Sequence, residues 1–145
     1  MTPLVRSVAR LLLVPGLLVA LAILVKGYRE VGDGFAAGVV AALAIVLQYL
    51  AFGYREAERA LPGRLAAPVA FAGLGLALVV AFVPVLRGDP PLTHSPGPGE
   101  AVIHVGTLEL LTAVAFDAGV FLLVVGVSVG MVRAFARATV RGEAT

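Results

Sequence analysis

One long apolar run limits what this chain can fold into. It extends from Leu108 to Val132 and reads LELLTAVAFDAGVFLLVVGVSVGMV. A helix needs about 20 mostly apolar residues, at about 1.5 Å each, to cross a bilayer, so the run is long enough to span one. A carboxylic acid, Asp117, lies in its middle. Because a carboxylate costs about 3 kcal/mol or more to insert at such a depth, it normally faces protein or water and has a function.

The composition assigns the whole chain to the membrane. Of its 145 residues, 60% are hydrophobic and only 14% are charged, against about 25% in a typical soluble domain. The sequence has no Cys, which excludes disulfides, Cys-ligated clusters and thiol catalysis. Two His and no Cys are also a poor basis for structural zinc. We therefore expect an integral membrane protein without a metal or other cofactor.

Four apolar stretches indicate an all-α integral membrane protein with four transmembrane helices in a single domain, 1–145. Their expected bounds are about 4–25, 35–52, 65–86 and 106–132, with an outer loop over 87–105. The first stretch resembles a signal peptide, but a short charged link and another span follow it, so we expect it to be retained. The loop is rich in Pro and Gly. Its Asp89, His94, Glu100 and His104 match no metal-binding spacing.

The basic residues predict the orientation of the spans. Placing both termini in the cytoplasm leaves eight of the eleven Lys and Arg residues inside and three outside. This division favours cytoplasmic termini, because cytoplasmic loops carry the excess of basic residues. The positive net charge is then a matter of membrane topology, and we expect no nucleic-acid partner.

Small residues recur on two of the predicted helices. Gly34 and Gly38 form a GxxxG spacing at the start of the second span, as do Gly126 and Gly130 in the fourth. Such spacing allows close approach of two helix backbones.

The turn before the second span either caps and packs that helix, with Asp33 at its start, or borders an ion or water path. Gly119 points roughly opposite Asp117, so both faces of the fourth helix are expected to contact protein, in the interior of a larger assembly.

Two acids of the fourth stretch are candidates for an ion or proton path. Asp117 is either a structural carboxylate bonded to a neighbouring helix or a participant in ion movement. Glu109 lies eight residues earlier, about 12 Å nearer the outer surface, and is either interfacial or part of the same path. No nucleophile and base pair, phosphate loop or haem-ligand pair is evident, so we expect no catalytic residues and no enzyme.

These motifs resemble the MnhB/MrpB subunit family of multisubunit sodium/proton antiporters. The segment from Leu111 to Ala134 is similar to the last helix of that family, and its pattern is matched by Phe116, Asp117, Gly119, Val120, Phe121 and Leu122. The family's glycine-rich turn is matched by Gly27, Gly32, Gly34, Phe35 and Gly38. The turn departs from the family at Tyr28, Arg29 and Val31, which replace His, Asn and Pro, and at Asp33 and Ala37, which replace glycines.

The resemblance implies an accessory subunit in the cell membrane of a prokaryote. Its partners would be the other membrane subunits of a hetero-oligomeric antiporter and the lipid bilayer. The module also resembles domains of membrane-bound hydrogenase and related respiratory complexes, so a structural role in a redox-driven assembly is the alternative. A third hypothesis is a small independent membrane protein.

Overall fold

The computed structural model describes residues 2–26, 33–61, 63–86, 88, 90–92, 104–105, 108–109 and 112–142. Its long helices are α1 (Pro3–Lys26), α2 (Asp33–Phe52), α4 (Ala66–Leu86) and α5 (Thr112–Gly142). Within the described residues, four helical segments are long and apolar enough to cross a membrane: Pro3–Lys26, Asp33–Phe52, Gly63–Leu86 and Thr112–Val140. This finding confirms the prediction of a helical protein with four candidate spans.

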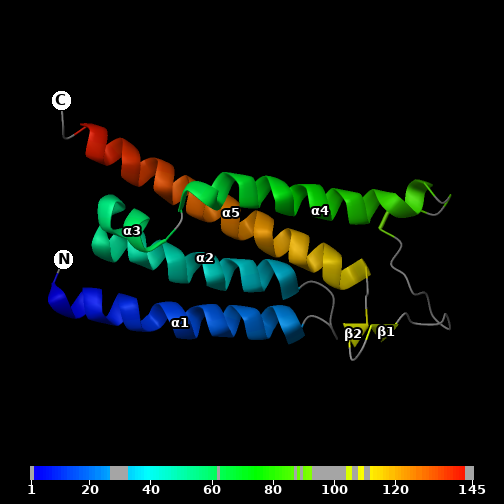
Figure 1. Cartoon of the computed structure of the whole chain (residues 1–145), viewed down its shortest axis with the longest axis horizontal. Helices are drawn as coiled ribbons and strands as arrows, with labels where there is room; N and C mark the ends of the chain where they lie inside the picture. Colours follow the sequence, from blue (N-terminus) through cyan, green and yellow to red (C-terminus); the bar gives the residue numbers. More distant parts are fainter. Residues whose placement is uncertain are drawn as a thin grey trace.

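The long helices follow one another across the bundle in the order α1, α2, α5, α4 (Figure 1). Helix α2 packs against α1 on one side and α5 on the other, while α4 packs mainly on α5. The start of α1 and the end of α5 lie at the same end of the bundle (Figure 1). This arrangement is compatible with the predicted location of both termini on one side of a membrane, although the side itself stays a prediction.

A short helix not expected from the hydropathy pattern follows α2. Gly53 has φ of 79°, a left-handed conformation that glycine adopts without steric cost, and α3 (Tyr54–Ala60) begins directly after it. A single 3-10 turn, η1 (Gly63–Leu65), then leads into α4. The seven residues of α3 include four charged ones, so a search for long apolar runs misses this element.

Helix α5 differs from its predicted bounds at both ends. It begins at Thr112 rather than at 106, because β1 (His104–Val105) and β2 (Leu108–Glu109) form an antiparallel pair before it. It continues past residue 132 to Gly142. Ala and Arg are strong helix formers, so the polar extension stays helical after the apolar run has ended.

Polar contacts join α1 to α2 and α3. Gln48 is buried in α2, and its Nε2 donates a hydrogen bond to the backbone oxygen of Ala9 at 2.7 Å. The Arg10 guanidinium lies over the Phe52 ring, 5.1 Å from its centroid. Arg6 and Glu56 form a loose, exposed ion pair at 4.0 Å. Most large side chains of α1 remain exposed, which is expected of a lipid-facing or partner-facing helix.

Candidate functional site

Asp117 is buried where α5 meets the start of α2. Only 4% of its surface is exposed. A Cβ atom added at Gly34 would lie 2.8 Å from the Cα of Asp117, closer than real Cβ contacts come. The two helix backbones therefore touch at this point, and a glycine is required at position 34 to allow it.

Asp33 adds a second acid to this contact, directly before Gly34. Among the described residues, its Oδ2 atom is buried and has no hydrogen-bond partner. Burying a polar atom without a partner costs free energy, so such an atom in a native fold calls for an explanation. Asp33 thus directly precedes the Gly34–Asp117 contact in the sequence, and one of its carboxylate oxygens has no hydrogen-bond partner among the described residues.

The α2–α5 contact continues at Gly38. A Cβ atom at Gly38 would lie 2.8 Å from the Cβ of Val124 and 3.2 Å from the backbone oxygen of Phe121. Phe35, by contrast, points outward and is 60% exposed, and Phe116 is half-buried. Gly32 and the side chain of Glu109 lie outside the described residues, although the backbone of Glu109 pairs with that of His104.

The opposite face of α5 packs on α4. A Cβ atom at Gly119 would lie 2.9 Å from the backbone oxygen of Gly73, and one at Gly126 would lie 2.6 Å from that of Ala66. Gly130 makes only an ordinary contact, with its built Cβ 3.8 Å from the Cβ of Ala66. Both faces of α5 are thus covered by helices of this same chain. The small residues on these faces therefore pack within the chain and do not require a neighbouring subunit. The sequence had led us to expect that both faces lie in the interior of a larger assembly.

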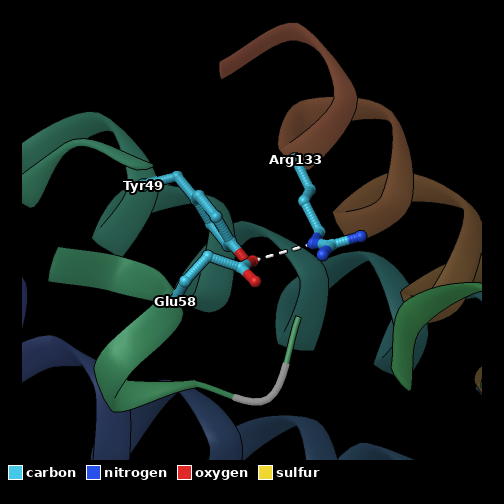
Figure 2. A network of polar contacts seen from close by, with 3 residues as sticks. All are labelled: Tyr49, Glu58 and Arg133. Carbon is cyan, nitrogen blue, oxygen red and sulfur yellow. Dashed lines mark hydrogen bonds and ion pairs between the residues drawn. The ribbon is translucent and has the colours of Figure 1, made fainter. Parts of the chain in front are cut away.

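A polar network lies at the other end of α2. Tyr49 of α2 donates a hydrogen bond from its Oη to Oε1 of Glu58 at 2.6 Å, and Nε of Arg133 lies 2.9 Å from the same oxygen. Figure 2 shows the three side chains converging from α2, α3 and α5. Gly63 lies directly against Tyr49 and Glu58, and any side chain there would collide with both. We call Tyr49, Glu58 and Arg133 the Glu58 network.

The environment of Glu58 favours its charged form. Burial alone raises the pKa of a carboxyl group, but hydrogen bonds from Tyr49 and Arg133 act in the other direction, as does the positive charge of Arg133 and Arg137. The net result is a pKa of Glu58 below its ordinary value. Glu58 therefore holds its negative charge at neutral pH and fixes α3 against α5.

The two polar sites are far apart along the helices. Gly34 and Tyr49 are separated by about 22 Å of α2, at 1.5 Å per residue. Residues 35–47 of α2 are all apolar, and residues 118–132 of α5 include only one polar side chain, Ser128. Asp117 and the Glu58 network thus have no continuous polar connection along these two helices. An ion or proton that reached Asp117 would need a route completed by other groups.

The candidates that the sequence suggests do not include several residues of these contacts, among them Tyr49, Glu58, Gln48 and Gly73. Arg133 enters the sequence prediction only through the membrane orientation. The sequence pattern that could have indicated these residues is a Tyr and a Gln near the end of an apolar span, followed by a short segment that carries both positive and negative charges. Such a pattern indicates an ordered interfacial helix, but the partner of Glu58, which is 75 residues away in the sequence, cannot be deduced from it.

The fold and these contacts define a small helical membrane protein with a buried acid. Residues 4–130 match the family described as "Domain related to MnhB subunit of Na+/H+ antiporter". The chain belongs to this family. Its resemblance to MnhB, inferred from the Phe-Asp-x-Gly-Val segment and the glycine turn, is thereby confirmed.

Several relatives cover most of the chain. The B subunit of the Na(+)/H(+) antiporter of Alkalihalophilus pseudofirmus is 36% identical over 106 residues, which are 73% of this chain and 72% of that protein. The corresponding B subunit of the Na(+)/H(+) antiporter of Bacillus subtilis is 35% identical over 117 residues, 81% of this chain and 80% of that protein. The probable A/B subunit of a K(+)/H(+) antiporter of Rhizobium meliloti is 36% identical over 131 residues, 88% of this chain but 12% of that protein.

Proposed function

We propose that this chain is an accessory subunit of a multisubunit cation/proton antiporter in a prokaryotic cell membrane, and that Asp117 borders the ion or proton path. The family and its relatives support the antiporter assignment. The observation that carries the role of Asp117 is its burial at a backbone contact between two candidate spans. Burying a carboxylic acid between two helices is costly, and a role in ion movement accounts for its presence.

Asp33 is proposed to take part in the same site. Its buried Oδ2 lies at the start of α2, next to the Gly34–Asp117 contact. Oxygen atoms of carboxylates suit both protons and hard cations. The relatives' names include both Na(+)/H(+) and K(+)/H(+) antiporters, so the proposal is limited to a monovalent cation or a proton.

The main partner is proposed to be a larger antiporter subunit. The Rhizobium meliloti relative carries the double designation A/B, and this chain matches a small part of its length. A subunit that is joined to another in one organism is expected to lie beside it where the two are separate chains. The exposed apolar side chains of α1 and α4 provide surface for such a contact.

The test is Asp117→Asn in the intact complex. This change keeps the approximate volume and the polarity of the side chain but removes its titratable charge. We expect the complex to assemble and cation/proton exchange in membrane vesicles, followed with a pH-sensitive dye, to fall at least about tenfold, as is typical when a proton-transferring group is lost. Asp117→Glu should retain measurable exchange. Normal exchange by an assembled Asp117→Asn complex would leave only the structural role for this residue.

The redox-driven alternative predicts different partners. In that case, the chain would co-purify with subunits that carry flavin, iron–sulfur or nickel centres, which are detectable by absorption or metal analysis. Antiporter subunits without redox centres would support the proposed function.

A further inference from the structure

A slot is left between α2 and α4. Both helices pack on α5, but they make at most a marginal contact with each other (Figure 1). The resulting cavity has a volume of about 190 Å³ and is lined by aliphatic side chains of α2, the η1 region, α4 and α5: Ile45, Leu61, Leu65, Val69, Val125 and Val129. We call this cavity the apolar slot.

A basic hollow adjoins the slot. It has a volume of about 460 Å³ and is lined by Glu58, Arg59, Ala60, Leu61 and Arg64. Leu61 belongs to both cavities, so they meet at the turn between α3 and η1. Arg59 and Arg64 come from opposite sides of this turn and are both exposed. Neither forms an ion pair with any residue in the described part of the chain.

The charge of the hollow is positive. Its one acidic residue, Glu58, is already neutralised by Arg133 and accepts the hydrogen bond of Tyr49. The nearby Glu56 is loosely paired with Arg6 and does not line the hollow. Arg59 and Arg64 therefore remain available for an anion that brings its own negative charge.

We propose that these two cavities bind one anionic phospholipid, with its phosphate between Arg59 and Arg64 and part of an acyl chain in the apolar slot. The combination of a cationic hollow and an adjoining aliphatic cavity matches an amphiphile with a negative head group. Basic pockets between transmembrane helices are a recurrent form of lipid recognition. This inference concerns a different part of the molecule from Asp117 and does not depend on an ion path there.

An apolar transmembrane helix of another subunit would satisfy only one of the two cavities. Its side chains can pack into the slot, but it brings no counter-charge to Arg59 and Arg64 of the adjoining hollow. A phospholipid places an acyl chain in the slot and a negative phosphate in the hollow. The lipid is therefore the occupant that satisfies both cavities together.

Native mass spectrometry of the full chain, with any subunits that co-purify, tests the proposal. The delipidated protein is titrated with phosphatidylglycerol and with phosphatidylcholine of the same acyl chains. We expect the wild type to bind phosphatidylglycerol preferentially. The double variant R59Q/R64Q should bind it about tenfold to thirtyfold more weakly, from the typical contribution of two basic residues. R59K/R64K, which keeps the charge, should retain most of the preference.

A matched control removes two charges from the same end of the bundle but outside both cavities. R6Q/R55Q should bind phosphatidylglycerol almost as well as the wild type does. V69F should fill part of the slot and weaken binding while leaving both arginines in place. Equal binding of the two lipids by the wild type, or an equal loss in R6Q/R55Q and R59Q/R64Q, would overturn the proposal. So would efficient cross-linking of a Val69→Cys variant to another membrane subunit, because a protein side chain would then occupy the slot.

Discussion

Nε of Arg133 lies 2.9 Å from Oε1 of Glu58, and this ion pair holds the short helix α3 against the polar extension of α5. The side chains of Glu58 and Arg133 are 20% and 27% exposed, so water screens the pair only in part. Tyr49, which shares the same carboxylate oxygen, is almost completely buried. The pair therefore belongs to the folded core of this end of the bundle, and its loss has a measurable cost.

Replacing Glu58 should destabilise the protein. Glu58→Ala leaves the hydroxyl of Tyr49 and the guanidinium of Arg133 without their common acceptor, which costs about 1–3 kcal/mol. Thermal unfolding in detergent, followed by circular dichroism, measures the difference. Glu56→Ala is the matched control, because Glu56 is exposed and only loosely paired, and its effect should stay below about 0.5 kcal/mol. Equal effects of the two substitutions would contradict the network.

The contribution of Glu58 to the stability of the folded protein should depend on pH. Because its pKa is lower in the folded protein than in the unfolded chain, the unfolded chain binds more protons in the acid range. The stabilisation is fully present above the unfolded pKa, about 4.3, and is lost as the pH falls through the lower folded value. The difference in unfolding temperature between wild type and Glu58→Gln should therefore be constant near neutral pH and shrink below about pH 4. If the difference in unfolding temperature instead grew as the pH fell, the pKa of Glu58 would not be lowered by folding.

Two glycines of α4 provide a sharp test of the contact with α5. A Cβ atom at Gly73 would lie 2.6 Å from the backbone oxygen of Gly119, whereas one at Gly75 would have no atom within 4 Å. We expect Gly73→Ala to destabilise the protein by about 1–3 kcal/mol through overpacking. Gly75→Ala should be neutral or slightly stabilising, since Ala favours a helix. Thermal unfolding of the two variants under the same conditions gives the comparison, and similar values would refute the close approach.

Gly126→Leu should separate α4 from α5 within the chain itself. A Cβ atom at this position would lie 2.7 Å from the Cα of Ala70, so a larger side chain cannot be accommodated without moving a helix. The variant should insert into the membrane but be lost from the purified complex, because its fold is disrupted. Gly130→Ala, at an ordinary contact distance, should assemble normally. Normal assembly of Gly126→Leu would show that the α4–α5 contact is dispensable.

Labelling of single cysteines tests the orientation. The native chain has no Cys, so a cysteine at Ser95, in the predicted outer loop, should react with an impermeant thiol reagent added outside the cell. A cysteine at Ala60, an exposed position at the end of α3, should not react until the membrane is opened. Ala57 of the same helix is a poor probe because it is buried. The reverse pattern would place both termini outside.

The sequence was sufficient to predict the four candidate spans, because hydropathy over about 20 residues is a strong signal. It was also sufficient to indicate that Asp117 is a buried acid. It was not sufficient to determine the ends of α5, since the pairing of Val105 with Leu108 and the helical extension after Val132 depend on hydrogen bonding rather than on hydropathy. The hydropathy pattern also did not predict helix α3, because this helix is short and rich in charged residues.

The partners of the small residues could not be predicted either. Glycines that permit close packing look the same in a sequence whether the second helix comes from this chain or from a neighbour. In the structure, Gly34 and Gly38 of α2 contact α5, and Gly119 and Gly126 of α5 contact α4. Large apolar side chains remain exposed on all four long helices, most of them on α1 and α4, and these faces are open to lipid or to other subunits.

The position of α5 between two helices has a consequence for how this chain can vary. Its backbone touches α2 near Asp117 and α4 near Gly119 and Gly126, so an added methyl group on either side displaces a whole helix. By contrast, apolar substitutions at exposed positions of α1, such as Leu11, meet no comparable obstacle. In a saturation mutagenesis of the whole chain, tolerance should therefore be lowest on these two faces of α5 and highest along α1.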